Sequence, residues 1–269
     1  MIKNVLTIAG SDPSGGAGIQ ADLKSFAANG VYGMAAITAL TAQNTQGVQS
    51  VELVSASFVK AQIEAVFADI RVDAIKIGMI ATAEIAVAVA EALADHDDLP
   101  IVLDPVMVAK GGAPLLQDDA TEALRRRLVP LASVLTPNLP EAARLLDEPV
   151  AITRDEMAAQ ARALPNLGPQ IALIKGGHLE GSDSPDVAWD GETLQWFEGS
   201  RHSTRNTHGT GCSLSSAIAA QLGQGKSPAA AIAQAKRFVT GAIAAADLQT
   251  VGHGHGPVHH FYDLWKDNL

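Results

Sequence analysis

The chain has 269 residues, of which 47% are hydrophobic and 18% charged, so it can bury a large core and is not a disordered protein. Its formal net charge is −10, and an acidic surface repels phosphate backbones, which argues against a nucleic-acid partner. The single cysteine, Cys212, excludes an internal disulfide and favours a reducing compartment, so we expect a cytoplasmic protein. No apolar run approaches the roughly 18 residues of a membrane span, so no membrane partner is expected.

Short apolar runs alternate with helical patterns along the chain. Strands are predicted at 5–9, 34–40, 74–77, 101–103, 134–135 and 171–174, with a hairpin at 187–189 and 194–197. Helices are predicted at 15–29, 58–70, 83–94, 120–128, 139–146, from the capping box at Thr153, at 212–222 and from Pro228 after Ser227 as N-cap. This alternation predicts an α/β fold with a mostly parallel central sheet and helices on both faces. No repeat or linker interrupts it, and we expect residues 1–269 to form one domain.

Glycine and polar residues follow six of the predicted strands. In sheets of this kind, ligands bind beyond the carboxyl ends of the strands. A single strand end carries turn residues for structural reasons alone, but six together favour a binding cleft. The residues concerned are 10–12, 41–44, 78–79, Asp104, 136–138 and 175–177.

Two segments partly match nucleotide-binding motifs. Residues 16–21 fit the pattern G-x-G-x-x-A, but the second strand does not end in the acidic residue that would bind a ribose, which argues against a nicotinamide cofactor. Residues 225–227 resemble the end of a P-loop. Ala220 stands where that motif needs its first glycine, and the segment joins two helices, so we interpret it as a turn.

The stretch 206–212 is the most informative part of the sequence. Gly209 and Gly211 flank Thr210 directly before an apolar helix. Consecutive N–H groups at a helix N-terminus form an anion site, which could stabilise a transferring phosphoryl group. An ordinary glycine-containing loop before a helix is the alternative.

Cationic and acidic side chains at three other strand ends fit the same chemistry. Asn138 and Glu141 lie three residues apart on one helix face and, with Asp104, could hold a hydrated Mg²⁺. Helix capping is the alternative for this pair. Lys175 places a cation where it could meet phosphates. The tail contains four histidines between 253 and 260, but no cysteine or acid completes a metal set, and a packing role is favoured.

Several blocks, in order along nearly the whole chain, resemble hydroxymethylpyrimidine/phosphomethylpyrimidine kinases. The blocks are residues 10–22, 76–79, 136–141, 175–178, 206–212 and 256–260. The resemblance implies a ribokinase-like fold, a role in thiamine biosynthesis, ATP and Mg²⁺ as cofactors, and a homodimer. It implies phosphorylation of 4-amino-5-hydroxymethyl-2-methylpyrimidine and then of its monophosphate.

The resemblance also assigns residues to the pyrimidine substrate. Gln43 and Asp22 are expected to read the ring by hydrogen bonds, because a side-chain amide supplies the donor and the acceptor that an aminopyrimidine edge needs. Met79 and Val106 are expected to pack on the ring, and Gly10 belongs to the same substrate site.

For the nucleotide, the resemblance implies contacts from Lys175, Asn138, Glu141 and Thr207, with Asp104 and Glu141 acting on Mg²⁺ directly or through water. Phosphoryl transfer depends mainly on positioning and charge neutralisation, which suits this set of residues.

The catalytic group implied by the resemblance consists of Lys175 and the anion hole Gly209, Thr210, Gly211 and Cys212. Sugar kinases of this superfamily carry an aspartate as general base where Cys212 stands, and a cysteine there is typical of the pyrimidine kinases. A thiol near a helix N-terminus can have a lowered pKa and act as the base, or a weak base can suffice.

Three alternatives stay open from the sequence. Pyridoxine or pyridoxal kinases are related and act on similar rings, and a non-catalytic ligand-binding protein could share the fold. Within the kinase hypothesis, the loop 14–18 either holds the acceptor phosphate of the second step through its N–H groups or only shapes the pocket.

Overall fold

An eight-stranded sheet organises the part of the chain that the computed structural model describes, residues 1–107 and 118–265. The strand order is β10-β9-β8-β7-β6-β5-β1-β2, in which β8 through β2 are parallel and β9 and β10 form an antiparallel edge. The strands are β1 (Asn4–Ala9), β2 (Tyr32–Ile37), β5 (Ala74–Ile77), β6 (Ile101–Leu103), β7 (Val134–Leu135), β8 (Ile171–Lys175), β9 (Asp186–Trp189) and β10 (Leu194–Phe197). The predicted α/β sheet is thereby confirmed.

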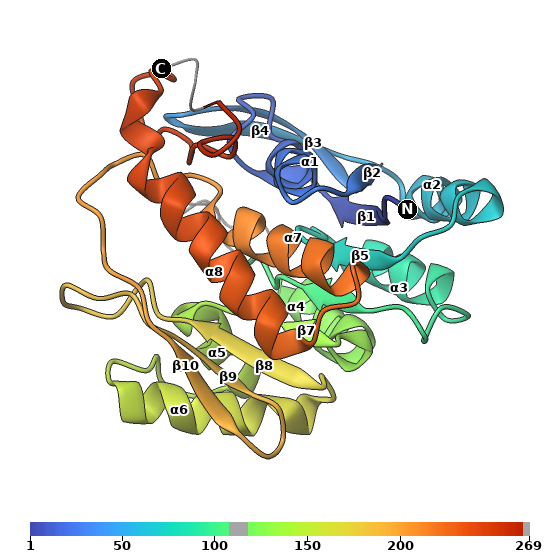
Figure 1. Ribbon diagram of the computed structural model, residues 1–269. Coiled ribbons are helices and arrows are strands. Elements are labelled where there is room, and N and C mark those ends of the chain that lie inside the picture. Colours follow the sequence, from blue (N-terminus) through green and yellow to red (C-terminus); the bar gives the residue numbers. More distant parts are fainter. Residues whose placement is uncertain (108–117, 266–269) are drawn as a thin grey trace.

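Helices cover both faces of this sheet, and α7 and α8 lie side by side on one of them (Figure 1). That face carries α1 (Gly18–Ala28), α7 (Thr210–Gly223) and α8 (Pro228–Ala244). The opposite face carries α2 (Ala56–Asp69), α3 (Ala83–Ala92), α4 (Asp118–Ala123), α5 (Leu139–Leu146) and α6 (Arg154–Ala163).

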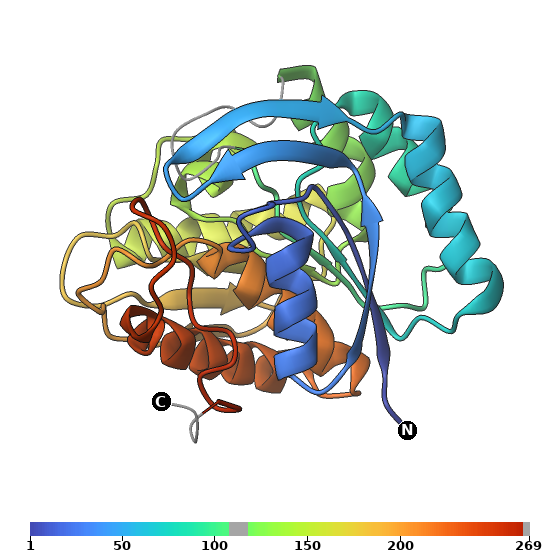
Figure 2. The same ribbon diagram turned by 90° about the horizontal axis from the view of Figure 1, so that it is seen from above.

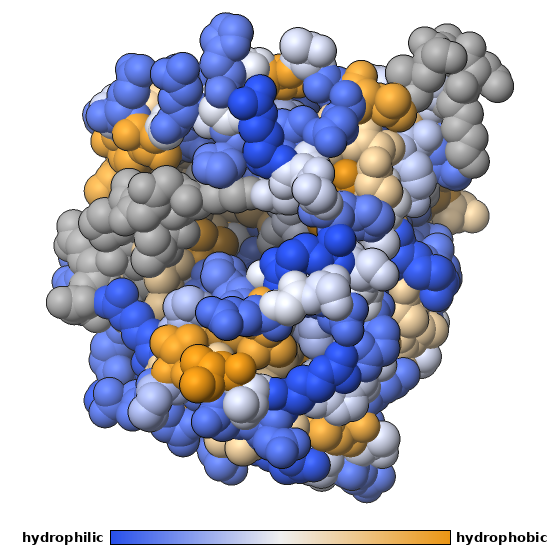
Figure 3. All heavy atoms as spheres, turned by 90° about the vertical axis from the view of Figure 1, so that its left-hand side faces the viewer, coloured by the Kyte–Doolittle hydropathy of each residue, from blue (hydrophilic) through white to orange (hydrophobic). Residues whose placement is uncertain are grey.

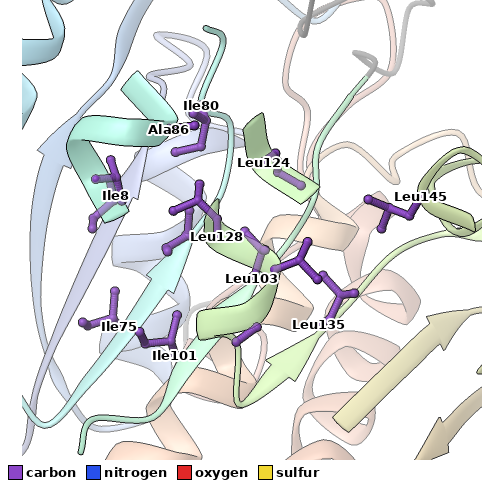
Figure 4. Close-up of a cluster of buried hydrophobic side chains, with 14 of the residues drawn as sticks. Ile8, Ile75, Ile80, Ala86, Ile101, Leu103, Leu124, Leu128, Leu135 and Leu145 are labelled. Atoms are coloured by element: carbon purple, nitrogen blue, oxygen red, sulfur yellow. The ribbon is translucent and has the colours of Figure 1, made fainter. Parts of the chain in front are cut away.

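Alternation along the strands separates the core into two halves. On β5, Ala74 packs with α7 and α8, whereas Ile75 and Ile77 pack with the helices of the other face. On β6, Val102 and Leu103 divide in the same way. Both faces of β5 and β6 are therefore mainly apolar, apart from the buried Lys76 on β5, which explains why these strands read as hydrophobic runs. Figure 4 shows the half that contains Leu103.

A separate two-stranded hairpin, β3 (Ala39–Asn44) and β4 (Gly47–Leu53), lies above the end of β1 (Figure 2). The prediction of one strand over 34–40 is wrong at its end, because β2 stops at Ile37 and the chain turns into β3. The Ser11 N–H donates to Ala39 O at 2.8 Å and holds the hairpin over this loop. Strand β4 was not predicted because most of its residues are exposed, so no core-facing alternation marks it.

Helix ends follow the predicted signals with three exceptions. The Thr153 hydroxyl accepts the Glu156 N–H, and Glu156 caps in return, which confirms the capping box of α6. Helix α1 starts at Gly18, later than predicted. The predicted helix 120–128 is α4 followed by a wider π-helical turn over Leu124–Leu128. Ser227 occupies the N-cap position of α8, but its side chain makes no capping hydrogen bond. The remaining short turns are η2 (Val129–Leu131), η3 (Leu164–Leu167) and η4 (Ala246–Leu248).

Within the described residues, no helix combines the length and the apolar character needed to cross a membrane. On the face shown in Figure 3, hydrophilic side chains predominate and hydrophobic ones form small separate groups, in keeping with the net charge of −10.

Leu103 tests the apolar half of the core in Figure 4, because its side chain is fully buried at the centre of the sheet. We expect Leu103→Ala to lower the free energy of unfolding by about 2–5 kcal/mol through lost burial and the cavity left behind. Ile152→Ala is the matched control, because Ile152 is 76% exposed and should change stability by no more than about 0.5 kcal/mol. Urea denaturation of both variants measures the difference, and equal effects would contradict the assignment of this core.

Candidate active site

Three charged side chains meet at the carboxyl edge of the parallel sheet. Lys175 Nζ lies 2.6 Å from Asp104 Oδ1 and 3.9 Å from Glu141 Oε2. Asp104 follows β6, Lys175 ends β8, and Glu141 sits in the first turn of α5 after β7, so three adjacent strands place the group. Asp104 and Glu141 are nearly fully buried, and Lys175 keeps 15% of its side-chain surface exposed. The predicted convergence of these residues is found.

Glu141 combines a capping role with a place in this group. Its carboxylate accepts the Asn138 N–H at 2.8 Å, and the Asn138 side chain accepts the Glu141 N–H at 2.9 Å, so the capping alternative is realised. Burial and the nearby Asp104 carboxylate together raise the pKa of Glu141 to about 7, although Lys175 opposes both effects. Two buried carboxylates thus share one ammonium group, which leaves the group short of positive charge.

The N-terminus of α7 faces the same group. Gly209 is the N-cap with φ +78°, a left-handed conformation that favours glycine. A Cβ atom added at Gly211 would lie 3.3 Å from Lys175 Nζ and 3.6 Å from Asp104 Oδ2. The N–H groups of a first helical turn have no partner inside the helix, so this turn presents donors next to the ammonium group. The arrangement suits a bound anion.

Asp22 and Lys76 form a fully buried ion pair beneath this turn. Lys76 Nζ lies 3.0 and 2.9 Å from the two Asp22 oxygens, which also accept hydrogen bonds from Thr7 and Ser216 at 2.7 Å each. All four acceptor positions of the carboxylate are therefore taken. This revises the expected role of Asp22, because a hydrogen bond to a substrate would have to displace one of these partners.

The environment of Cys212 argues against the first of the two alternatives, a thiol with a lowered pKa, and leaves the second, a weak base that suffices. Burial raises the pKa of its thiol to about 11, and Asp22 and Asp104 add to this effect, although Lys76 and the Gly18 N–H favour the thiolate. A position at the helix N-terminus does not overcome the effects of burial and the two carboxylates, so the thiol stays protonated at neutral pH.

Two of the residues expected to contact a substrate ring, Gly10 and Met79, lie together at the end of β1. A Cβ at Gly10 would lie 3.1 Å from Met79 Sδ, and Val106 follows Asp104 by two residues in the loop after β6. Gln43 was expected at the end of the second strand of the main sheet. It lies instead on β3 of the hairpin. A bulge between Ala42 and Gln43 interrupts the register at this point, and bulges re-aim side chains.

The loop 14–18 does not offer the N–H groups proposed for an acceptor phosphate. The Asp12 carboxylate accepts the N–H groups of Ser14, Gly16 and Ala17 at 2.9, 3.2 and 2.8 Å, and Asp12 O accepts that of Gly15. A protein carboxylate already occupies the anion position, so the alternative that the loop shapes the pocket is favoured.

Of the four C-terminal histidines, His259 and His260 are buried against the protein, whereas His253 and His255 are exposed. His260 Nε2 lies 2.9 Å from Ser213 Oγ, and burial lowers the pKa of His260 to about 3. His259 is also buried. Across residues 1–107 and 118–265, no group of three or more His, Cys, Asp or Glu residues is arranged to hold a metal ion.

Sequence reasoning gave no role to Asp12, Lys76 or His208, which all take part in the arrangement. A lysine within the apolar run 74–77 is the signal that could have identified Lys76, because an unpaired ammonium group is rarely buried. His208 directly precedes Gly209, but its partner Asp12 is 196 residues away, and no local pattern connects them.

Comparisons with known proteins agree with this architecture. A family model for phosphomethylpyrimidine kinase matches residues 12–259. The hydroxymethylpyrimidine/phosphomethylpyrimidine kinase of Salmonella typhimurium is 55% identical over 262 residues, which cover 97% of this chain and 98% of that protein.

Solved structures of related proteins have the same fold. The pyridoxal kinase from Staphylococcus aureus in complex with AMP-PCP and pyridoxal superposes with a TM-score of 0.89 at 35% identity, over 98% of this chain and 95% of that one. The phosphomethylpyrimidine kinase of Clostridium difficile 630 gives a TM-score of 0.79 at 43% identity, over 90% and 99% of the two chains.

Fold and site together define a ribokinase-like kinase, as the sequence resemblance implied. More narrowly, the chain belongs to the phosphomethylpyrimidine kinase family, a family of phosphotransferases.

The raised pKa of Glu141 predicts a pH-dependent stability. The folded protein holds this proton up to about pH 7, whereas the unfolded chain releases it near the ordinary value of 4.5. The folded state therefore loses stability as the pH rises through this window. Glu141→Gln removes the titration and keeps an oxygen for the Asn138 N–H. We expect urea denaturation to show wild-type stability falling, relative to this variant, by on the order of 1–3 kcal/mol across the window. A difference independent of pH would contradict the assignment.

Proposed function

We propose that this protein transfers the γ-phosphoryl group of ATP to the hydroxyl group of 4-amino-5-hydroxymethyl-2-methylpyrimidine and then phosphorylates the monophosphate to the diphosphate, in thiamine biosynthesis. The observation that carries the proposal is the Lys175–Asp104–Glu141 group facing the glycine-rich N-terminus of α7. The relative at 55% identity is a hydroxymethylpyrimidine/phosphomethylpyrimidine kinase, a name that covers both phosphorylations.

The residues at the sheet edge fit a nucleotide with Mg²⁺. Magnesium is commonly held by one or two carboxylates together with waters and substrate phosphates, so Asp104 and Glu141 would hold it. Burial is the main cause of the raised pKa of Glu141, but the Asp104 carboxylate adds to it and Lys175 does not cancel the two effects, which supports this fit. When bound, the ion would neutralise phosphate charge. Thr207 and Asn138, which flank the group, are proposed nucleotide contacts, and the AMP-PCP complex of the pyridoxal kinase supports nucleotide use.

Charge stabilisation in the proposed reaction comes from Lys175 and the first turn of α7. Phosphoryl transfer has a loose transition state, whose negative charge spreads over the equatorial oxygens. The backbone of Gly209 to Cys212 is held in place by the fold before the reaction, so its N–H groups need little reorganisation when that charge develops, although the Thr210 N–H donates to Thr207 O at 3.4 Å. Lys175 is held by Asp104 at the same edge, where its ammonium group meets the transferring group.

Gln43 is the proposed reader of the pyrimidine edge, with Gly10, Met79 and Val106 around the ring. Gln43 lies on the hairpin above the end of β1 and keeps part of its surface accessible. Asp22 contributes by holding Lys76 below the site rather than by reading the ring.

Pyridoxal kinase is a second candidate function, favoured by the structural likeness at a TM-score of 0.89. The pyrimidine kinase relative at 55% identity supports the first candidate more strongly than the pyridoxal kinase at 35% supports the second.

A substrate panel separates the two candidate functions. It consists of hydroxymethylpyrimidine, its monophosphate, pyridoxine, pyridoxal and ribose, each with ATP and Mg²⁺. We expect the two pyrimidines to have kcat/KM at least about 100-fold above the others, because unmatched polar groups in a specific site are strongly rejected. Preference for pyridoxal would overturn the first proposal, and no turnover would favour a binding protein.

We also infer a cytoplasmic homodimer that uses one domain for these steps. The eight-stranded sheet, to which all the site residues except Gln43 are attached directly or by a following loop or helix, supports the single domain. Exposed apolar side chains on the hairpin, Leu40, Val51 and Leu53, offer a surface for a second copy. Light scattering after size-exclusion chromatography tests the oligomeric state.

Lys175→Met tests whether the charged group at the edge of the sheet, which faces the N-terminus of α7, takes part in phosphoryl transfer. We expect kcat to fall about 10²–10³-fold, because a preorganised charge is lost where negative charge develops. Lys236→Met is the matched control: Lys236 pairs with Asp186 at 2.7 Å and is 14% exposed, almost the same as Lys175 at 15%. Steady-state kinetics should show the control within about threefold of wild type. Equal loss in both variants would show that a buried lysine, and not its place in the site, matters.

A further inference from the structure

We propose that Asp12 and His208 form a positioning pair that sets the N-terminus of α7 against the loop after β1, and so places the anion hole. His208 Nε2 lies 2.8 Å from Asp12 Oδ2, across 196 residues of sequence. The inference rests on the proposed kinase function, because the turn that the pair positions is the one proposed to stabilise the transferring phosphoryl group.

Both carboxylate oxygens of Asp12 accept hydrogen bonds from its own loop. Its side chain is 2% exposed, and it accepts the Ser14 N–H and hydroxyl on one oxygen. The other oxygen accepts the N–H groups of Gly16 and Ala17 and faces His208. Hydrogen bonds from His208 and the loop hold the pKa of Asp12 at about 2 against the opposing effect of burial, so it is an anion at neutral pH.

His208 is fixed through its backbone as well as its ring. Its N–H donates to Gly256 O at 2.9 Å, and its carbonyl accepts the Val258 N–H at 3.3 Å. The ring nitrogen that faces Asp12 also lies 3.3 Å from Gln43 Nε2 on the hairpin. The imidazole therefore sits where the first loop, the hairpin and the C-terminal segment meet, one residue before the N-cap of α7.

The contact that the pair maintains is too close for any side chain. A Cβ at Gly209 would lie 1.7 Å from Gly16 O, and a Cβ at Gly16 would lie 2.4 Å from His208 Cδ2. The Gly18 N–H, at the end of the same loop, lies near enough to the Cys212 sulphur to lower the pKa of that thiol. The first turn of α7 thus packs directly on the loop 12–18, and the Asp12–His208 hydrogen bond connects the two segments.

The charge of Asp12 explains why the bond matters beyond holding two loops together. A carboxylate near a proposed phosphate site repels the ligand unless donors surround it. Three N–H groups, a hydroxyl group and the His208 ring nitrogen provide them, and Lys24 lies close enough to interact with Asp12. Without the His208 donor, Asp12 loses its hydrogen bond to the residue that precedes the anion hole. The position of the first turn of α7 relative to the loop after β1 is then no longer fixed by this bond.

Three substitutions at one position separate the hydrogen bond from the ring and from packing. His208→Gln places an amide donor near the position of Nε2 and can still reach Asp12. His208→Met has similar length but no donor, and His208→Asn has the donor but is too short. We expect Gln to keep kcat within about fivefold of wild type, and Met and Asn to lower it about 10–100-fold, because small misplacements of catalytic groups carry losses of this size.

The kinetic pattern distinguishes positioning from general damage. A group that acts in the transition state changes kcat, so the KM for ATP should stay within about threefold in all three variants. Thermal unfolding should not rank the variants in the order of their kcat values.

Several outcomes would overturn the inference. Met as active as Gln would show that the hydrogen bond has no role, and Gln as impaired as Met would show that the imidazole itself is needed. If Asn does not fold, the comparison of Met with Gln decides. Wild-type protein without kinase turnover would remove the proposed function, and with it the role of the pair, whereas failure of the inference alone leaves wild-type turnover intact.

Discussion

The buried ion pair between Asp22 and Lys76 is the constraint on which the site depends. It joins α1 to β5, and through the Thr7 and Ser216 hydroxyl groups it also joins β1 and α7. Burial alone would lower the pKa of Lys76, but Asp22 reverses the effect and keeps the lysine charged. Burying two charges stabilises a protein little by itself, since desolvation offsets their attraction, yet removing either partner costs about 3–5 kcal/mol. The pair therefore fixes where α7 lies on the sheet more than it adds to stability.

The same logic of paired charges extends along the carboxyl edge of the sheet. Lys175 is held by Asp104 beside the first turn of α7, and Asp12 is held by its loop and His208 on the other side of that turn. Asp22, paired with Lys76, binds the Ser216 hydroxyl further along α7. Three paired groups near the start of α7 therefore have their geometry set before any ligand arrives. Preorganisation of this kind is the main resource of a phosphotransferase, because the protein has little covalent chemistry to perform.

Local patterns in the sequence were enough to predict the parallel sheet and the residues at its strand ends. Because parallel strands end at one edge of the sheet, the sequence predicted that Asp104, Glu141 and Lys175 lie near one another. The hairpin strand β4 could not be predicted, since its side chains face solvent and carry no core pattern, and Gln43 was misplaced with it. The partners of Asp22 and Asp12 were also out of reach. Ser216 and His208 lie more than 190 residues away, and only the folded chain shows that these carboxylates are already occupied.

The state of Cys212 shows how these constraints bear on the proposed chemistry. With a pKa raised to about 11, the thiol is protonated at neutral pH and is a poor general base. A loose transition state, however, demands little proton removal before the phosphoryl group has moved. The sulphur of Cys212 lies near enough to the Gly18 N–H for that group to favour the thiolate, and the adjacent Gly209 packs directly on Gly16. A small side chain fits this contact between two closely packed backbones. The site then works by positioning two reactants between fixed donors and Lys175, and the base can be left weak.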